Sequence, residues 1–204
     1  MRKIFITGIG TDVGKTIVSA VLAQAWRADY WKPVQAGKLP ETDSETVKKL
    51  LTNKISNVWP ENYLLENPVS PHYAASLENK IIQKAEMIPP PSSNKILLIE
   101  GAGGLMVPLN DEFLIIDLIS KLNAETIVVS KNYLGSINHT LLTINTLFHH
   151  KIPVLGIIFN GEENTVSEQF ILKYTGLKML GRIEKTQQIT REWIAKEAVK
   201  FSTL

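Results

Sequence analysis

The segment from Gly8 to Thr16 has the residue types and the spacing to hold phosphate groups. It reads Gly-Ile-Gly-Thr-Asp-Val-Gly-Lys-Thr and lies directly after a short apolar run and directly before an amphipathic stretch. Glycines allow backbone N–H groups to turn toward phosphate oxygens, and the start of a helix adds a partial positive charge. In such a loop Lys15 would reach the β- and γ-phosphates, and Thr16 would present its hydroxyl to Mg²⁺. The sequence therefore predicts a binding loop for a nucleoside triphosphate.

The glycine spacing makes this loop a variant. The usual pattern places its first glycine where Ile9 stands, and here glycines flank that position on both sides. A dinucleotide-binding fingerprint fits less well, because it would need a glycine at Val13 and would leave the Lys-Thr pair unexplained. A glycine-rich turn without a ligand is the other alternative, but the strand, the glycines, the Lys-Thr pair and the helix all agree with phosphate binding.

A second group of residues could complete a nucleotide site. Glu100 ends the apolar run Ile96–Ile99 and is followed by Gly101, Ala102, Gly103 and Gly104. An acidic residue at the carboxyl end of a buried strand beside a phosphate loop can bind the Mg²⁺ of the nucleotide, and the glycines after it allow a ligand to approach the backbone. Together with the loop, this group predicts a site for Mg²⁺ and ATP.

Four short apolar runs rich in β-branched residues recur along the chain, at Lys3–Thr7, Lys95–Glu100, Thr126–Ser130 and Val154–Phe159. Because they are apolar on both faces and far enough apart for crossover helices, they predict buried strands of a parallel sheet. Apolar residues at spacings of three and four predict helices over Thr16–Arg27 and Ser136–Phe148, with a closing helix over Glu192–Phe201. We therefore expect an α/β fold, doubly wound around a mainly parallel sheet, in a single domain over residues 1–204.

Composition narrows the function classes. The 204 residues are 44% hydrophobic and 21% charged, which fits a compact globular domain and excludes disorder, collagen and coiled coil. The chain has no cysteine, so it has no disulfide, thiol nucleophile or Cys-ligated metal site. A net charge of +2 with scattered basic residues favours neither nucleic acid nor membrane surfaces as partners. Thr7 and Gly8 break the first apolar run too early for a signal peptide, and no stretch is long enough to span a membrane, so we expect a cytoplasmic protein.

The motifs, taken in order, resemble those of the dethiobiotin synthetase family. They are Gly8–Thr16, Trp31-Lys32-Pro33-Val34-Gln35-Ala36-Gly37, Thr42-Asp43, Ser70-Pro71-His72, Glu100–Gly104, Leu134–His139 and Gly156–Asn160. The resemblance implies a fold of the P-loop nucleoside triphosphate hydrolase type and an ATP-dependent cyclo-ligase of biotin biosynthesis. Its substrates would be 7,8-diaminopelargonate, CO₂ or bicarbonate, and MgATP. A carbamate and then a carbamic-phosphoric anhydride would lead to dethiobiotin, ADP and phosphate, with no need for an enzyme nucleophile.

The resemblance also implies a role for individual residues. Lys15 and Lys32 would be catalytic, with Lys32 over the reacting centre, and Thr16, Asp43 and Glu100 would hold Mg²⁺. The nucleotide would contact Thr11, Asp12, Val13, Gly14, Lys15, Thr16, Asp43, Glu100, Gly101, Ala102, Gly103 and Asn160. The substrate would contact Lys32, Ala36, Ile137 and Asn138, the last two at the interface of a homodimer. For three of these residues a structural alternative stays open: Lys32 as a surface lysine, Asp43 as a solvated loop carboxylate, and Asn160 as a turn residue.

The chain departs from the family pattern in three places. Ala36 replaces the usual serine or threonine, Arg182-Ile183-Glu184 stands where the family reads Glu-Ile-Pro for its adenine pocket, and the helical stretch before Ile96 is shortened to Lys80–Met87. Prolines predict loops over Asn67–Pro71 and Ile88–Asn94. The adenine pocket and the substrate contacts are therefore where this chain should differ from its relatives.

Two other nucleotide-dependent classes share parts of the pattern. A cobyrinate amidating synthetase would need a glutaminase domain with a nucleophilic cysteine, which this chain lacks. A partition-type ATPase would carry a second lysine early in the loop, where Gly8 to Gly10 stand, and a basic DNA-binding surface. The histidines and tryptophans form no arrangement that requires a ligand, and we expect them to cap helices or pack.

Overall fold

The computed structural model describes residues 1–37 and 40–202. Within these residues seven strands form one sheet in the order β11-β10-β9-β1-β6-β2-β4, and every neighbouring pair is parallel. The strands are β1 (Arg2–Gly8), β2 (Asp29–Trp31), β4 (Val58–Trp59), β6 (Ile96–Glu100), β9 (Glu125–Lys131), β10 (Val154–Asn160) and β11 (Met179–Ile183). The predicted α/β fold with a mainly parallel sheet is confirmed, and the four apolar runs form β1, β6, β9 and β10.

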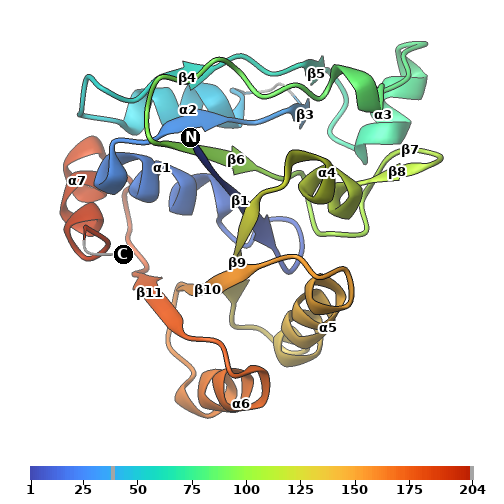
Figure 1. The fold of residues 1–204 in the computed structure, drawn as a ribbon. Coiled ribbons are helices and arrows are strands. Elements are labelled where there is room, and N and C mark those ends of the chain that lie inside the picture. The colour runs from blue at the N-terminus through green and yellow to red at the C-terminus, as the bar shows by residue number, and fades with distance from the viewer. Residues whose placement is uncertain (38–39, 203–204) are drawn as a thin grey trace.

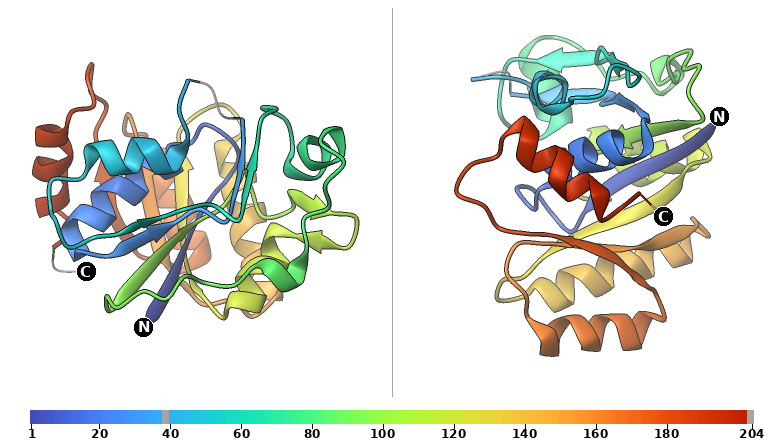
Figure 2. Two further views of the ribbon diagram at one scale, coloured as in Figure 1. Left: turned by 90° about the horizontal axis from the view of Figure 1, so that it is seen from above. Right: turned by 90° about the vertical axis from the view of Figure 1, so that its left-hand side faces the viewer.

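Helices cover both faces of the sheet (Figure 1, Figure 2). On one face lie α1 (Lys15–Trp26), α2 (Asp43–Leu50) and α7 (Arg191–Val199), and on the other lie α4 (Ile115–Leu122), α5 (Ser136–His149) and α6 (Thr165–Thr175). The three expected helices are present as α1, α5 and α7. In the part of the chain that the structure describes, no helix is both long and apolar enough to cross a bilayer.

The strand order reverses at β1, and this reversal creates the site. The chain leaves β1 toward α1 on one face, whereas it leaves the neighbouring strand β6 toward α4 on the opposite face (Figure 1). Loops that diverge in this way open a crevice at the carboxyl ends of the strands. Gly8, Glu100 and Asn160 end β1, β6 and β10, so the parallel arrangement brings all three to the same edge.

Smaller elements surround this edge. Strands β3 (Val34–Ala36) and β5 (Tyr63–Leu65) pair in parallel, and β7 (Pro108–Asn110) and β8 (Phe113–Leu114) form an antiparallel pair. Helix α3 spans Pro71–Leu77, so the loop predicted to end at Pro71 stops at Ser70, because proline is well suited to a first helical position.

The prediction of a helical stretch over Lys80–Met87 is wrong. Only Lys84–Glu86 forms a single 3₁₀ turn, η1. The buried side chains of this segment, Ile82 and Met87, are five positions apart, which does not place them on one face of a helix. The backbone N–H of Gln83 instead donates to the hydroxyl of Tyr63, 2.9 Å away. That residues 1–204 fold as a single domain stays a prediction.

Candidate active site

The loop between β1 and α1 is held in a tight turn by the end of β10. Gly14 precedes α1 with φ at +95°, in the left-handed region that favours glycine. A Cβ at this position would lie 2.0 Å from Nδ2 of Asn160, so a side chain there would force Asn160 to move. The same Nδ2 donates to the carbonyl of Val13 at 2.9 Å. Asn160 therefore contacts the loop directly, and its predicted contact with adenine stays a prediction.

Lys15 lies across the loop that precedes it. Its Nζ donates to the carbonyl oxygen of Gly10 at 2.8 Å, and the side chain is buried. Burial lowers the pKa of Lys15, although the negative charge of Glu100 opposes this shift. An ammonium group held over a turn of backbone N–H groups is the arrangement that binds phosphate.

The three oxygen-bearing side chains predicted to hold Mg²⁺ converge. The Oγ1 atom of Thr16 lies 2.9 Å from Oδ1 of Asp43 and 2.9 Å from Oε1 of Glu100. Thr16 comes from the first turn of α1, Asp43 from the first residue of α2, and Glu100 from the last residue of β6. Sequence motifs that are far apart in the chain therefore meet in one cluster.

Lys32 joins this cluster from the end of β2. Its Nζ lies 2.5 Å from Oδ2 of Asp43 and 3.2 Å from Oε1 of Glu100, and the residue is 4% exposed. Burial by itself would lower the pKa of Lys32, but the two carboxylates outweigh burial and raise it. Burial would likewise raise the pKa of Asp43, and the ammonium of Lys32 outweighs it and lowers that pKa. The structure thus excludes the surface-lysine alternative and shows a buried, charged Lys32.

Local structure fixes the position of Asp43. The hydroxyl of Thr42 accepts from the backbone N–H of Glu45 at 3.1 Å, and the carboxylate of Glu45 accepts from the N–H of Thr42 at 2.8 Å. This capping box starts α2 at Asp43, where a carboxylate also interacts favourably with the helix dipole. Asp43 is therefore not a loop residue. Its N–H also donates to Oε1 of Gln35, 3.3 Å away.

Two residues that contact this cluster, Tyr30 and Gln35, were not predicted from the sequence as site residues. Tyr30 is fully buried, and its hydroxyl donates to Oε2 of Glu100 at 2.9 Å. Burial, together with the charge of Glu100, raises its pKa well above the ordinary value. Gln35 bridges Asp43 to the carbonyl of Gly37, to which its Nε2 donates at 2.8 Å. Alternation along a strand could have pointed to Tyr30, because residues two apart, such as Tyr30 and Lys32, share a face.

The donor set fits a hard divalent cation. One hydroxyl and two carboxylates offer oxygen ligands of the kind Mg²⁺ prefers, and phosphate and water oxygens usually complete its octahedron. Among the described residues, no group of three or more His, Cys, Asp and Glu side chains could hold a metal ion. A cation at Thr16, Asp43 and Glu100 would therefore depend on a phosphate-bearing ligand for the rest of its coordination.

A cavity of about 810 Å³, which we call the loop cavity, opens beside this cluster. It is lined by residues that include Thr11, Asp12, Gly14, Lys15, Thr16, Ile17, Lys32, Gln35, Ala36, Asp43, Ser70, Glu100, Ala102 and Gly103. The structure thus brings together most of the predicted nucleotide residues and, from the substrate set, Lys32 and Ala36. Gly101 is explained by packing, because a Cβ there would lie 2.7 Å from the ring of Phe5.

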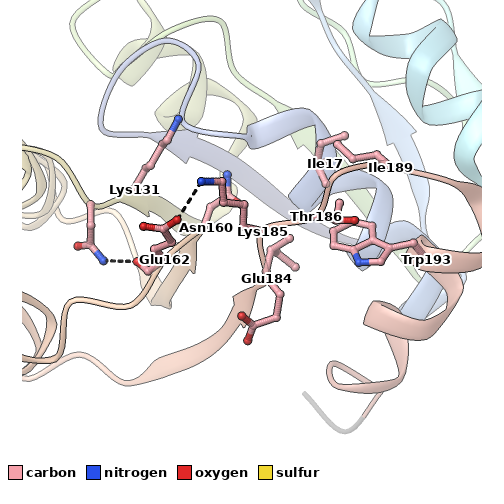
Figure 3. Close-up of a pocket in the computed structure, with 12 residues that line it drawn as sticks. Ile17, Lys131, Asn160, Glu162, Glu184, Lys185, Thr186, Ile189 and Trp193 are labelled. Carbon is pink, nitrogen blue, oxygen red and sulfur yellow. Dashed lines mark hydrogen bonds and ion pairs between the residues drawn. The ribbon is translucent and has the colours of Figure 1, made fainter.

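A second cavity of about 370 Å³, the strand-end cavity, lies at the ends of β10 and β11 (Figure 3). It is lined by Ile17, Lys131, Asn132, Asn160, Gly161, Glu162, Ile183, Glu184, Lys185, Thr186, Ile189 and Trp193. Ile17 lines both cavities, so the two are neighbours. Ile183 and Glu184 form part of the wall, and Glu184 is one of the residues in which the chain departs from the family pattern.

Ile137 and Asn138 lie elsewhere. They line a third cavity of about 810 Å³ at the start of α5, which we call the helix-start cavity. Neither residue lines the loop cavity, so a single chain does not place them beside Lys32. Leu134, on the rim of the helix-start cavity, is fully exposed, and His139 nearby pairs with the hydroxyl of Tyr133 at 2.7 Å. The predicted substrate roles of Ile137 and Asn138 stay predictions.

The loop after the central strand, the helix that follows it and the acidic end of the neighbouring strand define a nucleotide-binding protein of the P-loop ATPase class. A family model described as an AAA domain matches residues 2–193. The septum site-determining protein MinD of Pyrococcus horikoshii OT3, solved with Mg-ADP, has a TM-score of 0.59 at 16% identity, covering 99% of this chain and 89% of that one. At this identity the likeness shows the fold alone.

Relatives with similar sequences show the family to which the chain belongs. The chain is 52% identical to the ATP-dependent dethiobiotin synthetase BioD of Cytophaga hutchinsonii, over 98% of this chain and 97% of that protein. It is 49% identical to BioD of Christiangramia forsetii, over 98% and 96% of the two chains. The chain belongs to the ATP-dependent dethiobiotin synthetase family and is an ATP-dependent ligase. The resemblance found in the motifs is confirmed.

Proposed function

We propose that this enzyme carboxylates 7,8-diaminopelargonate with CO₂ and closes the ureido ring of dethiobiotin, with ATP converted to ADP and phosphate. Membership of the family supports the reaction. The observation that carries the proposal for this chain is the cluster that the buried Lys32 and Glu100 form with the half-buried Asp43 and Thr16 beside the loop between β1 and α1. That cluster supplies what the reaction requires, namely fixed charge at the point where two anions must meet.

The nucleotide would lie with its triphosphate in the loop cavity. Backbone N–H groups of the loop and the ammonium of Lys15 would bind the β- and γ-phosphates. Thr16, Asp43 and Glu100 would hold Mg²⁺, which, when bound, neutralises charge on the phosphates. The base would extend past Ile17 into the strand-end cavity, where Trp193 and Ile189 offer apolar surface.

Lys32 would bring the reacting groups together. One amine of the substrate adds to CO₂ to form a carbamate, and a carbamate oxygen attacks the γ-phosphorus of ATP, releasing ADP. The second amine then attacks the carbonyl carbon, which closes the ring and expels phosphate. Carbamate and γ-phosphate repel one another, and an ammonium that stays charged in a buried site offsets this repulsion. Positioning alone can supply on the order of 7–11 kcal/mol of barrier reduction.

The proposal includes a homodimer. Ile137 and Asn138 lie in the helix-start cavity, apart from Lys32 of the same chain. Backbone N–H groups at the start of α5 suit a carboxylate, and the exposed apolar side chain of Leu134 suits a protein contact. We therefore propose that this part of one chain receives the carboxylate tail of a substrate bound beside Lys32 of the other. A cytoplasmic location stays a prediction from the sequence.

The reaction can be tested directly. Purified enzyme is incubated with diaminopelargonate, ¹³C-bicarbonate and MgATP, and dethiobiotin is sought by mass spectrometry. Product one mass unit heavier than unlabelled dethiobiotin, formed in equal amount with ADP, is expected. Omission of Mg²⁺ with added chelator should abolish it. Release of ADP without labelled product would contradict the proposed reaction while leaving nucleotide hydrolysis intact.

A further inference from the structure

Both oxygens of the Glu100 carboxylate are bonded, one by a residue of strand β2 and the other by the residue that directly follows this strand. The hydroxyl of Tyr30 donates to Oε2 at 2.9 Å, and Nζ of Lys32 donates to Oε1 at 3.2 Å. Strand β2 pairs in parallel with β6, with Tyr30 opposite Leu98. Glu100 follows Leu98 by two residues and so projects from the same face of the sheet, within reach of the Tyr30 ring.

Tyr30 differs from the other residues of this cluster in its position. It is fully buried, and it is not among the described residues that line the loop cavity, whereas Lys32 and Glu100 both line it. From this position its hydroxyl reaches a ligand through Glu100, to which it donates. The hydroxyl also satisfies a carboxylate oxygen that would otherwise be buried without a hydrogen-bond partner, and such an oxygen is costly.

We propose that Tyr30 is a positioning residue, which holds the Glu100 carboxylate with Oε1 directed toward Thr16 and the cation. This inference rests on the proposed function, because it assigns Tyr30 to the support of the proposed Mg²⁺ site. Lys32 also binds Oε1, but in the proposed reaction Lys32 must turn toward the substrate. Tyr30 is bonded to the other oxygen, so it keeps Glu100 oriented when Lys32 moves.

Tyr30→Phe removes this hydroxyl and nothing else. The affinity for the β,γ-imido analogue of ATP is measured by calorimetry with Mg²⁺ and with chelator. Residues that orient metal ligands contribute about 10- to 100-fold to metal affinity. We expect the gain in affinity that Mg²⁺ gives to fall by about tenfold, with metal-free binding changed by less than about twofold. Tyr63→Phe is the matched control, because the Tyr63 hydroxyl bonds Glu86, outside the loop cavity.

A double-mutant cycle with Glu100→Gln tests whether Tyr30 acts through Glu100. In the Glu100→Gln background, Tyr30→Phe should leave the Mg²⁺-dependent gain unchanged. If Tyr30→Phe alone does not fold but the double variant does, Tyr30 stabilises the buried Glu100 charge, as the inference requires.

The inference is overturned if Tyr30→Phe retains the full Mg²⁺-dependent gain. It is also overturned if Tyr30→Phe has the same effect on binding, or on folding, in both backgrounds. A wild-type enzyme whose affinity for the analogue does not respond to Mg²⁺ would instead contradict the proposed metal site. Failure of the inference about Tyr30 can therefore be distinguished from failure of the proposed Mg²⁺ site.

Discussion

The loop cavity and the strand-end cavity are neighbours, yet they are built in different ways. In the loop cavity Lys32 and Glu100 are buried, only 4% and 1% exposed, and they are bonded to one another and to the half-buried Asp43. In the strand-end cavity the ion pair of Lys185 is exposed to solvent, and Trp193 contributes mainly apolar surface. Buried charges interact strongly and keep their positions, whereas exposed ion pairs contribute little. Under the proposed function, this difference predicts that catalysis depends on the loop cavity and that the strand-end cavity provides contact area for the base.

Lys32→Ala should have the largest effect and tests whether catalysis depends on the loop cavity. We expect kcat to fall by about 10³-fold, because the repulsion between carbamate and γ-phosphate loses its fixed counter-charge. Product formation is followed by mass spectrometry and nucleotide binding by calorimetry, which should show the nucleotide still bound. Lys185→Ala, at the other cavity, is the control and should leave kcat unchanged. A rate for Lys32→Ala within about tenfold of the wild type would show that Lys32 is not the catalytic cation.

The next largest effect is expected in the backbone of the loop itself. Gly14→Ala should lower the free energy of unfolding by about 1–3 kcal/mol, because alanine is strained at φ +95° and its Cβ would meet Asn160 at 2.0 Å. Binding of ATP should weaken by about tenfold, since the loop must shift. Gly10→Ala is the matched control. A Cβ at Gly10 meets nothing within 4 Å, so its change in stability should stay within about 0.5 kcal/mol.

The loop and the central strands of the sheet could be predicted from the sequence, whereas strand β2 could not. The loop and the four central strands were predicted because glycine spacing and long β-branched runs are local signals. Strand β2 was missed because Asp29 begins it, and a buried aspartate breaks an apolar pattern. The fold satisfies Asp29 through Asn57, Trp59 and Asn94, which come from distant parts of the chain. No local pattern reveals such a partnership.

Within the site the same limit applies to the partner of Tyr30, because alternation with Lys32 points to Tyr30 itself but not to Glu100. Its contact with Glu100 depends on the register between β2 and β6, and register is a property of the folded sheet. The position of Asp43, by contrast, could have been predicted, because Thr42 and Glu45 form a capping-box signature in the sequence. Local motifs therefore predicted the side chains that converge in the site, and tertiary pairing added Tyr30, which no motif contained.

A charge network lies next to the strand-end cavity and supports the loop that follows Asn160. The carboxylate of Glu168 forms an ion pair with Arg182 and accepts from the N–H of Asn164 at 3.1 Å and from Nδ2 of Asn132 at 2.5 Å. Arg182 also donates to the carbonyl of Gly161 at 3.3 Å. Arg182 is one of the residues in which the chain departs from the family pattern. In this chain it binds Glu168 and the backbone of Gly161.

Glu168→Gln tests whether this network acts on stability. Burial by itself would raise the pKa of Glu168, but the hydrogen bonds from Arg182, Asn164 and Asn132 together outweigh burial and lower it below the ordinary 4.5. A carboxyl whose pKa is lower in the folded state stabilises the fold above its unfolded pKa, and the contribution is lost as pH falls through the folded pKa. The free energy of unfolding of the wild type should therefore be about 1.5 kcal/mol higher than that of Glu168→Gln at pH 7. This difference in stability should become smaller below about pH 4.5. Urea unfolding across this range measures it, and a gap independent of pH would contradict the ion pair.

The smallest effect should come from the apolar wall of the strand-end cavity. Trp193 is half-buried beside Ile17 and Ile189, and an aromatic contact of this kind contributes about 0.5–1.5 kcal/mol beyond its area. Trp193→Leu should therefore raise KM for ATP by about three- to tenfold and leave kcat unchanged, because contact with the base is the same in the ground state and the transition state. Steady-state kinetics with saturating diaminopelargonate and bicarbonate would separate the two constants. If Trp193→Leu lowered kcat as strongly as it raised KM, the strand-end cavity would take part in orienting the triphosphate. The proposed division of roles between the two cavities would then be wrong.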